Sequence, residues 1–150
     1  MATGRVLIID DEESIRILCR LNLELEGYEV MEAADGETGV SIARAAKPDV
    51  IFLDVMMPVM DGWEALVRLK GDDATADIPV VMLTARVSEA DEIMAWGAGV
   101  LEYIHKPFDP DVLLECVAEA MKPRDPVVEA ERRQRLVEEL RVADHFRRRR

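Results

Sequence analysis

Five short apolar runs, each followed by a stretch of helical periodicity, constrain the fold of this chain more than any other feature. The runs are Val6–Ile9, Tyr28–Met31, Val50–Leu53, Val80–Leu83 and Val100–Ile104. The first, third and fourth are almost continuously apolar, which is typical of strands buried on both faces of a parallel sheet. The second alternates apolar and acidic residues, which favours an edge strand. Five strand–helix repeats predict an α/β fold, with a parallel sheet and helices on both faces.

Local signals indicate where the intervening helices start and stop. The first helix is predicted from an apolar stripe of Ile15, Leu18, Leu21 and Leu25, and Gly27 favours its end. Start signals of the other four helices are, in chain order, Asp35, Gly62, Ser88 with Asp91, and Asp109 before Pro110. Each connection between parallel strands is expected to be right-handed.

The chain divides near residue 122. Residues 1–122 carry the strand–helix repeats and are predicted to form one domain. Pro123 and Pro126 bracket a short linker, after which residues 127–146 form a charged segment. Its apolar residues share about one helical face, and they are Val128, Leu136, Leu140, Ala143 and Phe146. We therefore expect residues 123–150 to form an Arg-rich, helical C-terminal extension.

Composition limits the partners and the location of the protein. The net charge is −12, with 10 basic and 25 acidic residues up to residue 122 and 9 arginines and 6 acids after it. The acidic body repels nucleic acid and anionic membranes. Cys19 and Cys116 are too few for a disulfide framework or a four-cysteine zinc site. Because the sequence shows no long apolar segment and no secretory signal, we expect a cytoplasmic protein without membrane contact.

Charged and polar residues gather where the predicted strands end. The residues that follow these runs are Asp10, Asp11, Glu12, Asp54, Thr84, His105 and Lys106. In open α/β sheets the carboxyl ends of the strands form the edge where ligands bind. The sequence therefore predicts one polar site built from several strands.

The chemistry of this predicted site is phosphoryl transfer. Asp10, Asp11 and Asp54 would resist ionising side by side. A magnesium ion relieves that repulsion, since it takes oxygen ligands and commonly one or two carboxylates. One carboxylate can then attack phosphorus to give an acyl phosphate. The Lys106 ammonium and the Thr84 hydroxyl are suited to bind the phosphoryl oxygens.

Five segments resemble, in order and spacing, the receiver domain of bacterial two-component response regulators. These segments are Val6–Glu12, Val50–Pro58, Met60–Gly62, Val80–Ala85 and Lys106–Phe108, and the likeness covers about residues 5–121. The resemblance implies a flavodoxin-like, doubly wound five-stranded sheet in the order 2-1-3-4-5. It also implies a phosphoprotein that works as a switch in a phosphorelay and is not a metabolic enzyme, although it catalyses its own phosphorylation and dephosphorylation.

The resemblance assigns the acceptor and the metal ligands. Asp54 occupies the position of the phosphoacceptor, which carries an aspartyl phosphate in this family. Asp10 and Asp11 occupy the magnesium-binding pair. Asp54 itself and the backbone carbonyl of Met56 are the further expected ligands of Mg²⁺.

The resemblance also assigns the residues that respond to phosphorylation. Lys106 is expected to pair with the phosphoryl oxygens. Thr84 is expected to move toward the phosphoryl group, and Tyr103 to follow it from an exposed to a buried position. Met56 and Arg86 occupy positions that shape the access of water to the acyl phosphate. This bulky pair predicts slow self-dephosphorylation.

The partners implied by the resemblance are other signalling proteins. The phosphodonor is expected to be a sensor histidine kinase or a histidine phosphotransfer protein. The signal is expected to leave through a changed surface on the fourth helix, fifth strand and fifth helix. A homodimer through that surface or through the C-terminal helix is an open alternative. Only 29 residues follow Met121, too few for a DNA-binding or enzymatic output domain, unless such a domain was removed from the sequence.

Three interpretations of the C-terminal extension remain open. We favour a solvated or partly disordered segment. The extension would otherwise dock on its own domain or on a second copy of the chain. The third interpretation is that Arg147–Arg150 bind an anionic partner.

Two other functions compete with the receiver assignment. A phosphohydrolase of the haloacid dehalogenase type also uses a strand-end aspartate and magnesium, but it needs Asp-x-Asp where this chain has Asp10, Asp11 and Glu12. A transcription factor using the arginine-rich tail would show salt-dependent DNA binding that disappears without residues 127–150. The acidic body argues against this second alternative.

Overall fold

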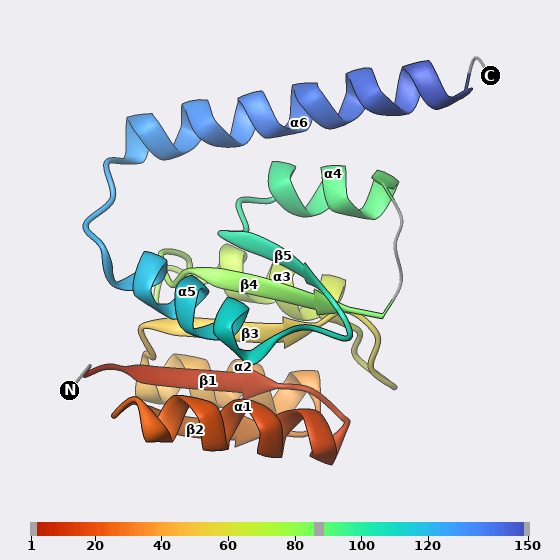
Figure 1. Ribbon diagram of the computed structural model, residues 1–150. Helices are drawn as coiled ribbons and strands as arrows, with labels where there is room; N and C mark the ends of the chain where they lie inside the picture. Colours follow the sequence, from red (N-terminus) through yellow and green to blue (C-terminus); the bar gives the residue numbers. More distant parts are fainter. Residues whose placement is uncertain (1–2, 86–88, 149–150) are drawn as a thin grey trace.

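The computed structural model describes residues 3–85 and 89–148 as a three-layer α/β domain with a long C-terminal helix (Figure 1). In chain order its elements are β1 Arg5–Ile9, α1 Glu13–Leu25, β2 Glu29–Ala33, α2 Gly36–Ala46, β3 Val50–Asp54, α3 Gly62–Gly71, β4 Val80–Thr84, α4 Glu89–Gly97, β5 Glu102–His105, α5 Pro110–Met121 and α6 Pro126–Arg148. All strand pairs are parallel, in the order β2-β1-β3-β4-β5. The predicted doubly wound fold, its sheet order and its C-terminal helix are confirmed.

Alternate residues of the strands build two hydrophobic cores, one on each face of the sheet. In β1, Val6 and Ile8 face α1 and α5, whereas Leu7 and Ile9 face α2, α3 and α4. The central strands β3 and β4 are buried along their whole length, as their continuous apolar runs predict. Strand β2 lies at the sheet edge and is mostly half-buried, which confirms the prediction from its alternating pattern.

Two strands start later than their apolar runs predict. The runs begin at Tyr28 and Val100, whereas β2 begins at Glu29 and β5 at Glu102. The N–H of Tyr28 donates to the carbonyl of Leu23, and the N–H of Val100 donates to the carbonyl of Ala95. Because these N–H groups close the turns at the ends of α1 and α4, the two residues belong to those turns.

The apolar stripe predicted for α1 was partly wrong. Leu21 and Leu25 are 52% and 81% exposed, whereas Cys19 and Leu23 are completely buried. The helix has apolar residues at four-residue spacing on two sides, and the sheet takes the side that holds Cys19 and Leu23. Burial raises the pKa of the Cys19 thiol to about 12, so this cysteine is a small buried hydrophobic residue.

Aspartate side chains cap three helices as their positions suggest. Asp35 accepts a hydrogen bond from the N–H of Thr38 at the start of α2. Asp61, the residue before the predicted start at Gly62, caps α3, and Asp109 caps α5. The predicted cap Ser88 lies outside the described residues.

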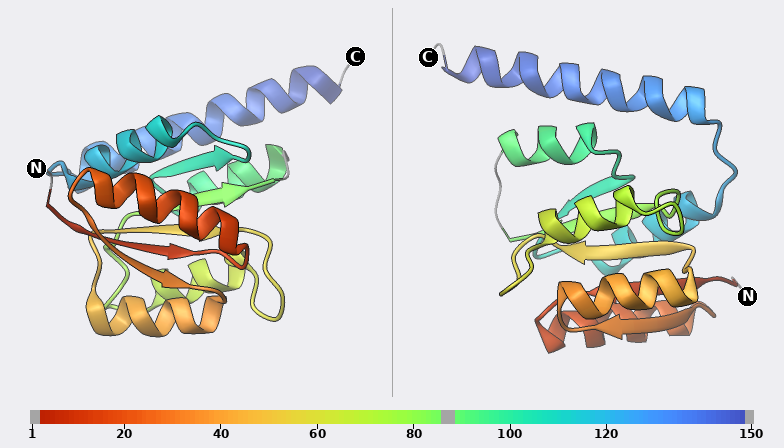
Figure 2. Two further views of the ribbon diagram at one scale, coloured as in Figure 1. Left: turned by 60° about the horizontal axis from the view of Figure 1, so that its bottom comes forward. Right: turned by 180° about the vertical axis from the view of Figure 1, so that it is seen from behind.

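Helix α6 docks on its own domain alongside α4 (Figures 1 and 2). Leu136, Val137 and Leu140 pack against the core on the α2–α3–α4 face, and the Arg132 guanidinium lies 5.7 Å from the ring centre of Trp96. The favoured expectation of a solvated extension was therefore wrong, because the thin apolar stripe finds a partner in α4.

The structure describes the C-terminal end of α6 only in part. The side chains of Phe146 and Arg147–Arg150 lie outside the described part, so the anion-binding interpretation of the terminal arginines stays a prediction. Within residues 3–85 and 89–148, no helix combines the length and the hydropathy needed to cross a membrane.

Candidate functional site

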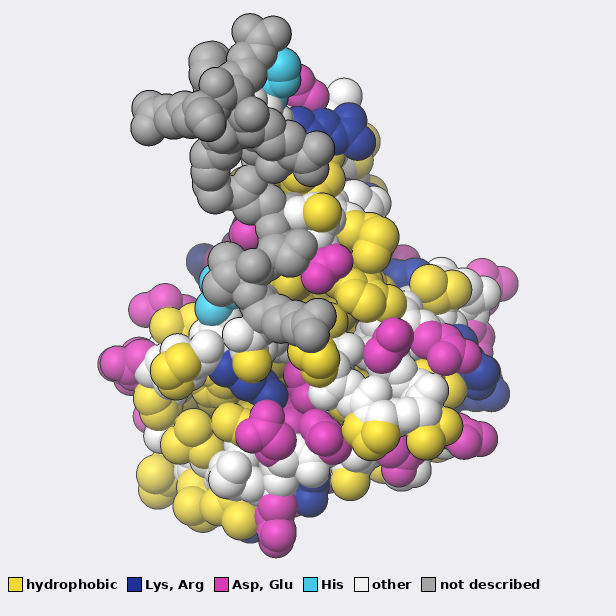
Figure 3. Space-filling model, turned by 90° about the vertical axis from the view of Figure 1, so that its right-hand side faces the viewer, with side chains coloured by type: hydrophobic (Ala, Val, Ile, Leu, Met, Phe, Trp, Pro, Cys, Tyr) yellow, Lys and Arg dark blue, Asp and Glu magenta, His cyan; other side chains and the backbone are white. Residues whose placement is uncertain are grey.

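Four strands bring polar side chains to one edge of the sheet, at their carboxyl ends. Asp10 directly follows β1, Asp54 and Thr84 are the last residues of β3 and β4, and Lys106 directly follows β5. Asp10 and Thr84 are completely buried, and Asp54 is 3% exposed. Figure 3 looks onto this edge, where acidic side chains gather near the middle. The structure therefore brings these predicted side chains together at one edge of the sheet.

The ammonium of Lys106 lies among three carboxylates. Its Nζ is 2.7 Å from Oδ2 of Asp10, 3.1 Å from Oε1 of Glu12 and 3.5 Å from Oδ1 of Asp54. The lysine side chain is itself 8% exposed, and its peptide bond to Pro107 is cis. When all three acids are ionised, they exceed the one ammonium by two negative charges, which is the charge that one divalent cation balances.

Burial and repulsion make Asp54 a weak acid. Burial is the largest cause and the charge of Asp10 the next, and together they raise the pKa of Asp54 to about 7 against the opposing effect of Lys106. Burial also raises the pKa of Asp10. For Lys106, burial is the largest cause and lowers the pKa, but the contacts with Asp10, Asp54 and Glu12 together outweigh it, so the net pKa is raised. The ammonium therefore stays charged while the carboxyls resist ionising.

Three side chains at this edge could hold a metal ion together. Asp10, Glu12 and Asp54 each offer a carboxylate oxygen, and these oxygens lie within 4.8 Å of one another. Donors that are all oxygen suit a hard cation such as Mg²⁺, so the residues fit a divalent metal. Glu12 was absent from the predicted ligand set, although its place at the end of the strand-end acidic run was an available signal. Asp11 is exposed, and its carboxyl is a minor cause of the raised pKa of Asp54.

The loop between β3 and α3 fixes the position of Asp54. The N–H of Met56 donates to Oδ1 of Asp54 over 3.2 Å, and the N–H of Gly62 donates to the carbonyl of Val55 over 2.8 Å. A Cβ at Gly62 would collide with the backbone oxygen of Asp54 and lie 2.7 Å from Cα of Val55. This close approach requires glycine. The Met56 side chain is 46% exposed, as expected for a residue at the rim of the site.

Thr84 and Tyr103 are in contact across neighbouring strands. Burial raises the pKa of Tyr103, and a hydrogen bond with Thr84 partly opposes that rise. Tyr103 is 6% exposed, and its ring meets the ring of His105 edge-on with 5.4 Å between centroids. The structure thus brings the two predicted switch residues together, but the exposed starting position expected for Tyr103 was wrong, because its ring is already buried beside Thr84. Arg86, the predicted partner of Met56, lies outside the described residues.

Comparison with known proteins defines the class to which this chain belongs. The family model of the response regulator receiver domain matches residues 6–118, so the chain is a member of that family. Its role is that of a phosphoacceptor in two-component signalling. Receiver domains take their phosphoryl group from histidine kinases.

Individual relatives support the same assignment. The chain is 42% identical over 126 residues to the DNA-binding dual master transcriptional regulator RpaA of Synechocystis, covering 84% of this chain and 52% of RpaA. It is 35% identical over 114 residues to protein PilH of Pseudomonas aeruginosa, covering 76% of this chain and 94% of PilH. The chain spans about half the length of several curated relatives that it matches, RpaA among them.

Solved structures agree with the sequence comparison. The chemotaxis protein CheY4 of Vibrio cholerae superposes with a TM-score of 0.75 at 35% identity, covering 80% of this chain and all of CheY4. The receiver domain of the Francisella response regulator 1452 superposes with a TM-score of 0.72 at 30% identity, covering 78% of this chain and 95% of its own. The predicted resemblance to the receiver family is therefore confirmed.

Proposed function

We propose that this receiver domain takes its phosphoryl group onto the side chain of Asp54. The supporting observation is the Asp54 carboxyl itself, which is buried at a strand end, 3.5 Å from the Lys106 ammonium, with a pKa raised to about 7. A phosphoryl group attached there would bring its negative oxygens beside a fixed cation in a site largely shielded from water. Such preorganised charge stabilises a transition state more than bulk water does.

The proposed reaction exchanges one bond to phosphorus for another. An Oδ atom of Asp54 forms the new O–P bond, and the N–P bond of a phosphohistidine donor breaks. The electron pair of that bond stays on the imidazole nitrogen, which takes up a proton. The Lys106 ammonium contacts Asp10 and Asp54, so it would also lie close to the oxygens of a phosphoryl group on Asp54 and could stabilise their negative charge. Hydrolysis of the resulting acyl phosphate restores the carboxylate.

The proposed cofactor is Mg²⁺. Its proposed ligands are Asp10, Asp11, Asp54 and the backbone carbonyl of Met56, and the carboxylate of Glu12 joins these candidates because it lies within reach of Asp10 and Asp54. Bound magnesium would supply neutralisation of the phosphoryl oxygens. The protein would orient the Asp54 carboxyl, and Asp10 and Glu12 would hold the Lys106 ammonium in place.

Thr84 and Tyr103 are the proposed switch residues. The Thr84 hydroxyl would turn toward the phosphoryl group. Because the Tyr103 ring is already buried in this structure, phosphorylation would stabilise the buried position of the ring and would not bring it in from the surface. The change would reach the surface through α4, β5 and α5. Met56 and Arg86 are proposed to limit the access of water and so to slow dephosphorylation.

Helix α1 offers the proposed docking surface for the phosphodonor, a histidine kinase or a histidine phosphotransfer protein. Ile17, Leu21 and Leu25 follow one another at four-residue spacing and are 37%, 52% and 81% exposed. Helix α1 starts at Glu13, directly after the acidic run of the site. An exposed apolar stripe on a helix that starts next to the site is suited to a partner that must bring its phosphohistidine to Asp54.

The domain division and the output are also proposals. Residues 1–122 would form the receiver unit and residues 123–150 the helical extension that docks on it. The protein would act in the cytoplasm as a switch without turnover of a free substrate. Its output would pass through protein contacts, including a homodimer through the α4-β5-α5 face or α6. We propose no DNA contact by residues 1–150.

The test is the intact mass of the protein after incubation with acetyl phosphate and Mg²⁺. The wild type and the control variant Asp73→Asn, which changes an exposed aspartate, should each gain one phosphoryl group of about 80 Da. Asp54→Asn, and the wild type in EDTA, should gain nothing. A gain in Asp54→Asn equal to that of the wild type would contradict the proposal, as would continuous hydrolysis of p-nitrophenyl phosphate by the wild type.

A further inference from the structure

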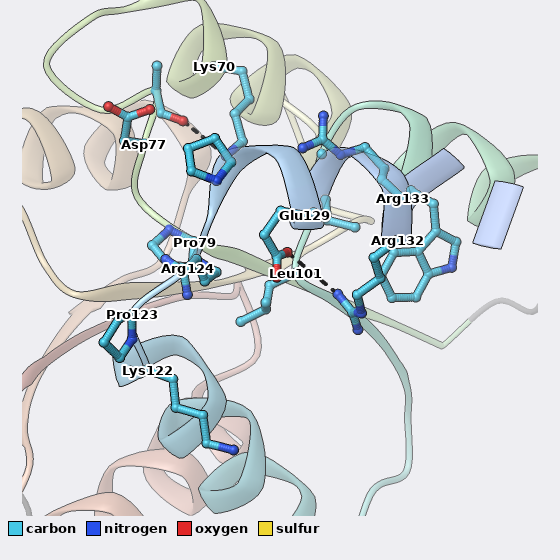
Figure 4. A pocket seen from close by; sticks show the side chains of 15 residues that line it. Lys70, Asp77, Pro79, Leu101, Lys122, Pro123, Arg124, Glu129, Arg132 and Arg133 are labelled. Carbon is cyan, nitrogen blue, oxygen red and sulfur yellow. Dashed lines mark hydrogen bonds and ion pairs between the residues drawn. The ribbon is translucent and has the colours of Figure 1, made fainter. Parts of the chain in front are cut away.

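A cationic cleft lies on the side of the molecule where α6 meets the domain, away from the carboxyl ends of the strands (Figure 4). It has a volume of about 580 Å³, within the usual range of small-molecule sites. Its walls come from α3, from the segments before β4 and β5, from the linker after α5 and from α6. Residues far apart in the sequence therefore meet around one space.

The charge of this cleft is opposite to that of the protein. Five cationic side chains line it, and they are Lys70, Lys122, Arg124, Arg132 and Arg133. The acidic side chains that line it are Asp77 and Glu129. The whole chain carries a net charge of −12. A local excess of cations in such a chain is an unusual concentration of positive potential.

Two of these cations already have carboxylate partners. Lys122 pairs with Glu119 at 3.0 Å, and Arg132 lies 3.8 Å from Glu129 while it covers the Trp96 ring. These ion pairs partly neutralise the charges of Lys122 and Arg132. The charges of Lys70, Arg124 and Arg133 are then the ones to be examined for a carboxylate partner.

Among the described side chains, no carboxylate lies within ion-pair distance of Lys70, Arg124 or Arg133. The Lys70 ammonium donates to the backbone carbonyls of Ala76 and Ile78, at 3.1 and 3.2 Å. Arg124 donates to the carbonyl of Ala120, and a Cβ built on Gly99 would be 3.5 Å from the Arg133 guanidinium.

The pKa of Lys70 also reflects the excess of positive charge in the cleft. Burial is the largest cause that lowers the pKa of its ammonium, and the positive charge of Arg133 is the next. Arg124 lowers this pKa further, while Asp77 opposes the change. Lys70 is thus partly removed from water and surrounded by more positive than negative charge. An anion among these three cations would relieve that repulsion.

We propose that this cleft binds a compact phosphate-bearing polyanion, with a diphosphate group contacting Lys70, Arg124 and Arg133. Three cations without carboxylate partners call for more than one negative charge. Guanidinium groups match phosphate oxygens in pairs of parallel hydrogen bonds, and a lysine adds a point charge. The ligand would connect α3, the linker and α6, and so would hold α6 against α4. This site lies apart from Asp54 and does not rest on the proposed function.

The test is calorimetric titration of the full chain with inorganic pyrophosphate, and in a second arm with ADP. Both titrations use EDTA and constant ionic strength, so that magnesium chemistry at Asp54 takes no part. We expect saturable one-to-one binding with a Kd below about 1 mM. Equal affinity for the two probes would mean that the phosphates alone are recognised. Tighter binding of ADP would mean that the nucleoside adds contacts in the cleft.

Two matched arginine variants decide whether the cleft is the site. Arg133→Gln removes a cation that lines the cleft, whereas Arg135→Gln removes one from the exposed side of the same helix. We expect Arg133→Gln to weaken pyrophosphate binding about tenfold, as for one lost charge-assisted hydrogen bond, and Arg135→Gln to leave it unchanged. Absence of saturable binding by the wild type, or equal weakening in both variants, would overturn the proposal.

Discussion

The buried carboxyl of Asp54 should make the magnesium-free protein less stable as the pH rises. Its pKa is about 7 in the folded protein, against an ordinary value of 3.8, because burial and the charge of Asp10 disfavour ionisation. Between these two values the folded state holds a proton that the unfolded chain has released. The free energy of unfolding therefore falls as the pH rises through this window, and the loss is complete above about pH 7.

The size of this effect follows from the shift. A difference of about three pKa units corresponds to at most ~4 kcal/mol, at 1.36 kcal/mol per unit. Water entry and local relaxation make the change smaller than this upper limit, so we expect the free energy of unfolding to fall by about 2–4 kcal/mol between pH 4 and pH 8. Asp54→Asn keeps the shape of the side chain without the charge and should not show this part of the loss. Asp10 also has a raised pKa and remains in the variant, so the informative quantity is the difference between the two proteins.

The assay is urea unfolding in EDTA at several pH values for the wild type, Asp54→Asn and the control Asp73→Asn. Asp54→Asn should be more stable than the wild type at pH 8 by about 2–4 kcal/mol and similar to it near pH 4. Asp73→Asn should follow the wild type, because Asp73 is exposed. Magnesium at pH 8 should stabilise the wild type more than Asp54→Asn. Parallel pH profiles of all three proteins would show that the ionisation of Asp54 does not cause the pH dependence of stability.

Three further substitutions test other parts of the structure. Gly62→Ala forces a Cβ into the backbone at Asp54 and should lower the free energy of unfolding in urea by at least about 2–3 kcal/mol. Gly71→Ala, which has open space around it, should raise that free energy by up to about 1 kcal/mol. Equal effects of the two substitutions would contradict the close approach of Gly62 to the backbone of Asp54. In a Trp63→Phe background, Leu136→Ala should lower the free energy of unfolding by about 1–2 kcal/mol and shift the Trp96 fluorescence to the red, and an unchanged spectrum would argue against docked α6. Lys106→Gln should slow phosphorylation by acetyl phosphate about a hundredfold, measured by intact mass, and an unchanged rate would remove Lys106 from the mechanism.

Much of the fold could be predicted because its signals are local. Continuous apolar runs identified β3 and β4, and an aspartate before proline identified the start of α5. The starts of β2 and β5 could not be predicted, because Tyr28 and Val100 are apolar residues whose N–H groups close helix-end turns. The buried stripe of α1 was ambiguous for a related reason: Leu21 and Cys19 both have apolar neighbours at helical spacing, and only the sheet selects between them.

The location of the site could be predicted from the sequence, but several contacts among its side chains could not. Acids at strand ends pointed to Asp10 and Asp54, but the ion pair of Glu12 with Lys106 joins residues that lie 94 positions apart in the sequence. The docking of α6 depends on contacts with α4 that no local pattern records. The cleft lined by Lys70 and Arg133 could not be predicted from sequence either, because its cations come from separate elements.

The most direct measurement is to locate the phosphoryl group on the chain. The protein is phosphorylated with acetyl phosphate and Mg²⁺ and then reduced with borohydride, which converts an aspartyl phosphate to homoserine. Peptide mass spectrometry then reads the modified position. We expect homoserine in place of Asp54 and unmodified aspartate at Asp10 and Asp11. Modification at another residue, with Asp54 intact, would contradict the assignment of Asp54 as the phosphoacceptor.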